Sequence, residues 1–350
     1  MCYNKLRFTE GKNVIRNVLW ILVCFSLLAT AASAEKVNVV DLEGHIVNVE
    51  APVHKVVSLG TGDAGYIYAL DKGLCLVGRD SYSYLPNDLQ KVPVAGTSSY
   101  SPDLELIMKL NPDLVVADSM ISDENRKKLE SAGIPVLMEW IADPVQGIKV
   151  MEDLGRVMGK EERANELIGF IERYQDLIRE RTSGIKQEDR PRVFFEWTKK
   201  PYYTVSNGSS SDTLIGLAGG RNIAKNLGNG THSFLSVSPE WVVKTDPDVI
   251  IQTPTSDKPL NEADLKEFRD AILSRPELKD AKAVKTGRVY VISGEVMYGI
   301  NSIIGELYLA KCFNPDQFKD IDPEAVQREL VEKFYGQSQE ERPYVYPSSS

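Results

Sequence analysis

A glycine-rich turn near the start of the chain carries the clearest candidate chemistry. Gly60, Gly62 and Gly65 spell G-x-G-x-x-G between an apolar run and a helical pattern, and Asp80 follows twenty residues after Gly60. In such a turn the glycines let a pyrophosphate approach a helix N-terminus and the acid binds a ribose, as in an NAD-dependent enzyme. The alternative is a tight strand-to-helix turn that faces a cleft. We favour the turn, because nothing downstream supplies a site for hydride transfer.

Other catalytic signatures are missing from the sequence. It contains no G-x-S-x-G, P-loop or H-E-x-x-H pattern. The three histidines, His45, His54 and His232, are too few and too widely spaced to hold a bare transition-metal ion. We therefore expect a protein that is not an enzyme and carries no cofactor or protein-bound metal.

Two segments 135 residues apart repeat one short pattern. They are ELIMKLNPDLVV at 105–116 and EWVVKTDPDVII at 240–251, each with Glu first, Lys four residues later, then Pro-Asp and an apolar run. Helix-start and helix-stop chemistry explains part of this, with Ser101-Pro102 and Ser238-Pro239 as N-cap and first-turn proline. A first-turn Glu at one fixed distance from a strand in both copies predicts two similar halves.

Short apolar runs alternate with helical patterns on both sides of one long helical stretch. This alternation predicts an α/β fold with two Rossmann-like lobes, each with a central parallel sheet, joined by one long rigid helix. We expect the linking helices to begin where Asp143 caps and Pro144 opens a helix. The predicted organisation is a signal peptide at 1–34, an N-terminal α/β lobe at 35–142, a linking helical segment at 143–185, a C-terminal α/β lobe at 186–336 and a mobile tail at 337–350.

The first 34 residues have the pattern of a secretory signal. A basic start precedes the apolar run 18–28 and the small-residue site Ala32-Ser33-Ala34. An uncleaved membrane anchor is the alternative, although the run is short for a span of about 20 residues. We expect the mature protein in the periplasm or on the outer face of the cytoplasmic membrane.

Charge and cysteine content narrow the partners further. The whole chain has net charge −9, and without the leader, which holds four basic residues and one acid, the net charge is −12. Nucleic acid is therefore not an expected partner. Cys75 and Cys312 remain after the leader, and we expect each to be buried singly, although an oxidising compartment would allow them to pair. Asn207 and Asn229 begin glycosylation sequons that also fit Asn-Gly turns.

Aromatic residues gather in loops that follow predicted strands. The carboxyl ends of parallel strands form the ligand crevice of open α/β sheets, so these rings are candidates to line a pocket for an organic ligand. Half-buried packing is the alternative for each. The residues are Tyr82, Tyr84, Tyr100, Trp197, Tyr202, Tyr203, Phe234 and Tyr298.

Taken together, these features make the chain resemble the iron-siderophore and cobalamin substrate-binding proteins of ABC importers. This is the periplasmic-binding-protein class whose lobes are joined by one helix. The resemblance runs from about residue 37 to 336. The segments that carry it are VVDLEGHIVNVEAPVHKVVSL, VAGTSSYSPDLELIMKLNPDLVVA, LIGLAGGRNIAKNLG, SVSPEWVVKTDPDVII, AVKTGRVYVIS and NPDQFKDIDPEAVQRELVEKFYG, the last being closest to archaeal members.

The resemblance implies a function and its residues. It implies a monomer that captures a metal chelate, first of all an iron-siderophore complex and alternatively a corrinoid or haem, with little lobe closure. It implies that Glu105 and Glu240 dock on an ABC permease dimer. By position in the family's cleft loops, with Arg79 added as a group that can meet an anionic chelate, the candidate ligand contacts are Arg79, Tyr82, Tyr84, Ser99, Tyr100, Trp197, Tyr203, His232, Phe234, Glu295 and Tyr298.

Overall fold

The computed structural model describes residues 35–140, 143–198, 200–227, 234–338 and 342–348. The predicted signal peptide, the sequon at Asn229 and the candidate ligand contact His232 lie outside these ranges. Within them, none of the helices combines the length and apolar character that a bilayer crossing needs.

The N-terminal lobe is built on a five-stranded sheet in which every neighbouring pair is parallel. Its order is β5-β4-β3-β6-β7, so β3 lies in the middle and later strands are added on both sides. Strands and helices alternate along this lobe, as the sequence pattern predicts. The elements are β1 (Glu35–Val40), β2 (Ile46–Ala51), β3 (Val56–Ser58), α2 (Asp63–Asp71), β4 (Leu76–Asp80), β5 (Val94–Gly96), α3 (Leu104–Leu110), β6 (Leu114–Ala117), α4 (Asp123–Ser131) and β7 (Val136–Met138).

The C-terminal lobe is built on a larger, mixed sheet. The parallel strands β8, β12 and β13 form its centre, and antiparallel strands complete its edges in the order β11-β9-β8-β12-β13-β14, with β10 pairing with β8. The segments VFF of β8 and VII of β12 are apolar throughout because both faces of these central strands are covered. The elements are β8 (Arg192–Trp197), β9 (Tyr203–Val205), α7 (Ser210–Leu217), β10 (Arg221–Asn222), β11 (Phe234–Ser236), α8 (Pro239–Thr245), β12 (Val249–Thr253), α9 (Glu262–Leu273), α10 (Lys282–Lys285), β13 (Val289–Ile292), α11 (Ser302–Phe313), α12 (Pro323–Leu330) and β14 (Val345–Tyr346).

Two helices, α5 (Gln146–Val157) and α6 (Glu161–Thr182), link the lobes. The first begins two residues later than predicted, because Asp143 accepts hydrogen bonds from the amides of Val145 and Gln146 and so caps the turn that precedes the helix. Gly155 lies where α5 meets α6, and a Cβ there would be 2.6 Å from the Cβ of Ala164. Glycine therefore permits the close packing of these two helices.

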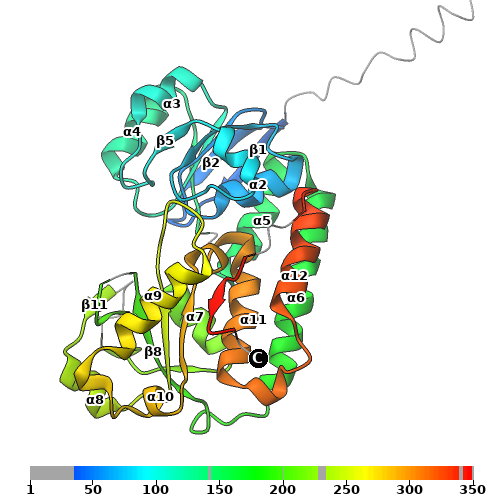
Figure 1. The fold of residues 1–350 in the computed structure, drawn as a ribbon. Coiled ribbons are helices and arrows are strands. Elements are labelled where there is room, and N and C mark those ends of the chain that lie inside the picture. Colours follow the sequence, from blue (N-terminus) through cyan, green and yellow to red (C-terminus); the bar gives the residue numbers. More distant parts are fainter. Residues whose placement is uncertain (1–34, 141–142, 199, 228–233, 339–341, 349–350) are drawn as a thin grey trace, which may run out of the picture. The chain divides into compact units, whose positions relative to one another are not determined.

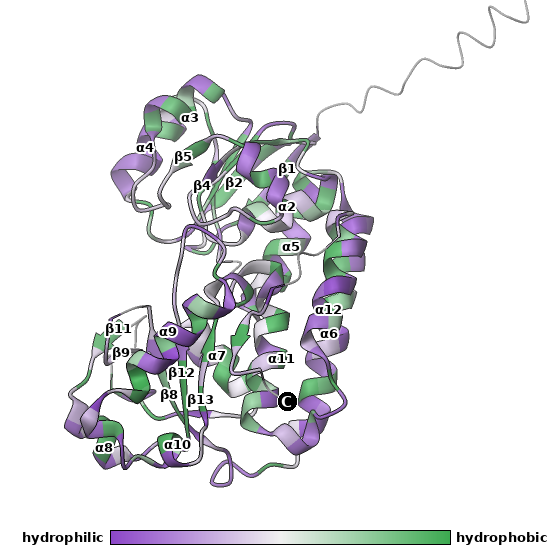
Figure 2. Cartoon of the chain, viewed as in Figure 1, coloured by the Kyte–Doolittle hydropathy of each residue, from purple (hydrophilic) through white to green (hydrophobic). Residues whose placement is uncertain are grey.

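The long helix α6 is tied to the rest of the chain by three arginines. Arg163 donates to the carbonyls of Ala69 in α2 and Lys333 near the C-terminal end. Arg173 and Arg181 form ion pairs with Glu329 and Asp320. Figure 1 shows α6 beside α12 and α11, and Figure 2 shows that it carries both hydrophilic and hydrophobic residues along its length. The helix therefore bonds to elements of both lobes.

The duplicated segments form equivalent structures, although the first helix begins later than predicted. The N-cap of α3 is Asp103, not Ser101, and its side chain accepts from the amide of Leu106. Ser238 caps α8 as predicted. Asp103 and Ser238 are themselves 135 residues apart, so the glutamates occupy the second helical position in both copies. Both helices end on a left-handed residue, Asn111 or Asp246.

The Pro-Asp that follows each helix also has one role in both copies. Asp113 accepts hydrogen bonds from the amides of His54 and Lys55, just before β3. Asp248 accepts from the amide of Arg192, the first residue of β8. In each lobe this carboxylate links the start of one parallel strand to the start of its neighbour. The repeat is therefore a device for joining a helix to a sheet, present once per lobe.

The described residues of the predicted mobile tail, 337–338 and 342–348, pack on the rest of the fold. Val345 and Tyr346 form β14, which pairs antiparallel with β13, and Tyr344 and Val345 are buried. Gln337 donates to Tyr68 and Asp88 of the N-terminal lobe. The prediction was wrong because it rested on the polar composition of the segment. A few of its side chains pack on surfaces that distant residues form, and composition does not reveal such contacts.

A pair of glycine substitutions tests the linking helices. Gly155→Val should lower the free energy of unfolding by about 1–3 kcal/mol, because the new side chain meets Ala164. Gly169→Ala in α6 should raise it by about 0.5–1 kcal/mol, since nothing lies within 4 Å of that position. Urea unfolding followed by circular dichroism measures both. Equal destabilisation by the two variants would contradict the assigned packing.

Candidate ligand-binding cavity

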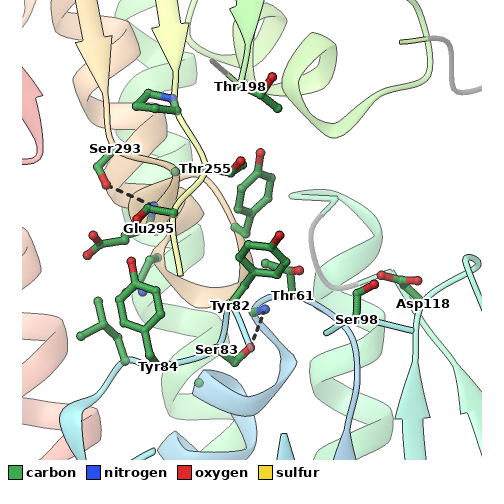
Figure 3. A pocket seen from close by; sticks show the side chains of 18 of the residues that line it. Thr61, Tyr82, Ser83, Tyr84, Ser98, Asp118, Thr198, Thr255, Ser293 and Glu295 are labelled. Carbon is green, nitrogen blue, oxygen red and sulfur yellow. Dashed lines mark hydrogen bonds between the residues drawn. The ribbon is translucent and has the colours of Figure 1, made fainter. Parts of the chain in front are cut away.

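A cavity of about 410 Å³ lies between loops of the two lobes. Its lining comes almost entirely from the carboxyl ends of strands, where the crevice of an open α/β sheet is expected. Figure 3 shows Tyr82 and Tyr84 of the N-terminal lobe extending toward Thr255 and Glu295 of the C-terminal lobe. This volume lies within the range of cavities that bind organic ligands.

The C-terminal lobe supplies an aromatic wall. Trp197 follows β8 and has its ring 5.4 Å from that of Phe234 and 5.7 Å from that of Tyr298. Tyr203 stacks on Phe234 with the ring centres 6.2 Å apart. Trp197, Phe234 and Tyr298 line the cavity, whereas Tyr203 supports the wall from outside the lining. Such a row of rings offers a broad apolar surface to a flat ligand.

The N-terminal lobe supplies a tyrosine loop that Asp80 holds in place. One oxygen of Asp80 accepts from the amides of Tyr82 and Ser83, and the other from the Ser83 hydroxyl. Burial raises the pKa of Asp80 to about 7 despite these hydrogen bonds. The side chain has no solvent exposure, so Asp80 positions the loop and is not available to bind a ribose.

The glycine motif has structural uses that differ from phosphate binding. A Cβ on Gly62 would lie 2.7 Å from backbone atoms of Gly299 in the other lobe, and one on Gly65 would lie 3.2 Å from the Tyr335 hydroxyl. The two lobes therefore meet backbone to backbone at Gly62. Asp63 begins α2, where a dinucleotide would place its pyrophosphate, and this buried carboxyl disfavours an anion there.

Acidic groups are concentrated at the carboxyl edge of the first sheet. Burial raises the pKa of Asp63, and the charges of Asp118, Asp80 and Glu139 raise it further. Asp118 and Glu295 are among the residues that line the cavity, and no lysine or arginine belongs to the described part of that lining. No group of three or more His, Cys, Asp or Glu side chains among the described residues is arranged to hold a metal ion. The cavity is thus suited to a ligand without net negative charge.

Several predicted contacts lie elsewhere. The Arg79 guanidinium is buried within the N-terminal lobe and donates to the carbonyls of Leu89 and Asp80, so it does not meet an anion in the cavity. The buried hydroxyl of Ser99 accepts from the amide of Asp118 and positions that residue. Tyr100 is 77% exposed and lies outside the described lining. Tyr82, Tyr84, Trp197, Phe234, Glu295 and Tyr298 do line it.

The lining also includes residues that the sequence did not single out. Most of them follow strands and could have been found by applying the strand-end rule to polar residues as well as to aromatic ones. Asn301 and Tyr335 lie instead at the start of α11 and after α12, and only the tertiary fold brings them to the cavity. The additional residues include Thr61, Ser83, Ser98, Asp118, Met120, Thr255, Ser293, Asn301 and Tyr335.

The sequence pattern of the periplasmic binding protein family matches residues 56–296, about two-thirds of the chain. The chain belongs to this family. Its fold agrees with solved periplasmic binding proteins. A TroA-like periplasmic binding protein, FepB, from Veillonella parvula has a TM-score of 0.71 and 25% identity, with 88% of this chain and 99% of that chain covered. The Haemophilus influenzae molybdate-binding protein MolA has a TM-score of 0.73 at 20% identity, over 87% and 99% of the two chains.

Three curated relatives are similar in sequence over more than half of this chain. An ABC transporter substrate-binding lipoprotein, YvrC, from Bacillus subtilis is 27% identical over 81% of this chain and 87% of its own length. A cobalamin-binding protein from Halobacterium salinarum is also 27% identical, over 62% of this chain and 58% of that protein. A vitamin B12-binding protein from Vibrio campbellii is 26% identical over 57% of this chain and 70% of that protein.

Substitution of Asp80 tests the role assigned to the tyrosine loop. Asp80→Ala should destabilise the loop and weaken ligand binding about tenfold, since Tyr82 and Tyr84 lose their anchor, whereas Asp80→Asn keeps one acceptor for the two amides and should bind within about threefold of wild type. Isothermal titration calorimetry measures both. Equal binding by the alanine variant would show that the loop needs no anchor.

The pH dependence of stability gives a second readout for the same residue. The folded-state pKa of about 7 lies above the ordinary value of 3.8, so the folded state holds the proton of Asp80 to higher pH than the unfolded state does. Stability from this group is greatest below about pH 4 and is lost as the pH rises to about 7. The Tm of Asp80→Asn relative to wild type should therefore be higher at pH 8 than at pH 5.

Proposed function

We propose that this chain is the extracytoplasmic substrate-binding protein of an ABC importer. It captures a metal chelate between its two lobes and delivers the chelate to a membrane permease. The observation that carries this proposal is a cavity between the carboxyl edges of two sheets, walled by aromatic rings, in a member of the periplasmic binding protein family. The role named for YvrC supports it.

The chelate we favour is a corrinoid. The family resemblance implied an iron-siderophore complex first, but the described lining of the cavity has no lysine or arginine to bind an anionic ferric chelate. Haem carries carboxylates and meets the same objection. Cobalamin has neutral amide side chains around a flat ring, which suits polar side chains beside an aromatic wall. The names of the Halobacterium and Vibrio relatives point to the same class.

Titration of the purified protein tests this proposal. We expect cyanocobalamin to quench the fluorescence of Trp197 with a Kd at or below about 1 μM, with weaker responses to haemin and to a ferric tris-catecholate. NADH should give no response, because Asp63 and Asp80 occupy the places that its pyrophosphate and ribose would need. Binding of NADH with no response to any chelate would reverse the assignment and favour an enzyme.

The two equivalent glutamates form a candidate surface by which this protein docks on the permease. Glu105 and Glu240 are both exposed. At the position three residues after each, Met108 and Val243 are 43% and 41% exposed. Each lobe thus presents one carboxylate and one apolar side chain on a short helix that an aspartate joins to the sheet. Two such contacts, one per lobe, suit a partner made of two similar permease subunits.

A double substitution tests the docking surface. Glu105→Ala with Glu240→Ala should leave chelate affinity within about twofold and reduce uptake through the permease at least tenfold, since a truncated rim charge weakens association and leaves the cavity intact. The matched control is Glu124→Ala with Glu262→Ala, which removes exposed first-turn glutamates from α4 and α9. Loss of chelate affinity in the first variant, or equal loss of uptake in both, would contradict the proposed docking surface.

A further inference from the structure

An arginine from the C-terminal tail pairs with one of the acids of the cavity. Arg342 Nη1 lies 2.9 Å from Glu295 Oε1, and Nη2 contacts the second carboxylate oxygen, which makes a two-point ion pair. The side chains are only 11% and 7% exposed. Burial by itself lowers the pKa of Arg342, but the hydrogen bonds and the charge of Glu295 raise it overall. The guanidinium therefore keeps its positive charge at neutral pH.

The two partners face different spaces. Glu295 lines the cavity, and its carboxylate lies near the hydroxyl of Tyr84, which points toward it in Figure 3. Arg342 is not part of the described cavity lining. It lines a small recess of about 40 Å³, which shares Leu85, Asn301 and Tyr335 with the cavity. A ligand in the cavity would thus meet the carboxylate, while the compensating cation lies on the far side.

The tail is built to hold Arg342 in this position. The guanidinium lies 4.7 Å from the ring centre of Tyr344, a cation–π distance. Tyr344 is buried, and the strand β14 that follows it pairs with β13, from whose end Glu295 follows. The pairing brings the two charges close together, because Glu295 lies three residues after β13 and Arg342 lies three residues before β14.

We infer that Arg342 is a specificity-determining residue of the cavity. By neutralising Glu295 it removes the negative charge that this wall would otherwise present, and so it makes the cavity select chelates that bear no net charge over positively charged ones. This inference rests on the proposed chelate-binding function, which it deepens. It assigns a role in ligand choice to a segment that lies outside the cavity.

Two opposite substitutions test the inference in the full-length protein. Arg342→Met leaves Glu295 uncompensated, and Glu295→Gln leaves Arg342 uncompensated. The probes are cyanocobalamin and aquacobalamin, which share one corrin ring and differ by one positive charge. The ratio of their Kd values should shift about tenfold toward the cation in Arg342→Met and about tenfold away from it in Glu295→Gln. The double variant should return near the wild-type ratio.

A second measurement reads the cavity charge without any chelate. Substitution of Trp20, Trp140 and Trp241 by Phe leaves Trp197, which lines the cavity, as the sole tryptophan. Arg342→Met should increase quenching of Trp197 by caesium and decrease quenching by iodide, and Glu295→Gln should do the reverse. Arg181→Met, which breaks the ion pair with Asp320 outside the described cavity lining, is the control and should change neither.

The outcomes separate the two proposals. Opposite shifts in the two single variants, cancelled in the double variant, support the role of Arg342, since loss of packing would move both variants in one direction. Shifts of equal sign, or unchanged quenching in both, would overturn it. If wild type binds neither corrinoid, the proposed corrinoid ligand is wrong, and the quenching measurement still decides whether Arg342 sets the charge of the cavity.

Discussion

The close approach of two backbones at Gly62 and Gly299 is the constraint on which the cavity depends. These residues belong to different lobes, and a Cβ on either would lie 2.7 Å from backbone atoms of the other. Because no side chain separates the lobes there, the strand-end loops on both sides come close enough to enclose one cavity. Tyr82 and Tyr84 can then face Glu295 and the aromatic wall. The same glycine that suggests a cofactor turn in the sequence is used here to join two halves.

Residues outside the described cavity lining position or neutralise several of the polar groups that line it. Asp80 anchors the tyrosine loop, Ser99 positions Asp118, and Arg342 compensates Glu295. Each of these residues is buried or nearly so, and each acts on a group that lines the cavity. The polar chemistry available to a ligand therefore depends on a second layer of hydrogen bonds and ion pairs, and the lining residues alone do not describe it.

The predicted fold was confirmed because it depends on local patterns. Apolar runs too short for helices, alternating with capped helical stretches, specify parallel sheets with helices on both faces. The duplicated pattern that begins at Glu105 and Glu240 could also be recognised in the sequence. Its N-caps, left-handed helix ends and following Pro-Asp each depend on only a few neighbouring residues. One error was also local: Asp103, not Ser101, caps the first copy, because the Asp103 side chain accepts from the amide of Leu106 in the first helical turn.

The sequence by itself determined the α/β class, the two similar halves, the long linking helix and the aromatic residues that follow strands. The tertiary structure decided which polar groups meet. Arg79 turned inward to bond carbonyls, whereas Arg342, in a tail that composition marked as mobile, reached Glu295 across 47 residues of sequence. The physical reason is range: helices and strands are encoded over a few neighbouring residues, but an ion pair depends on where separate elements place two side chains in space.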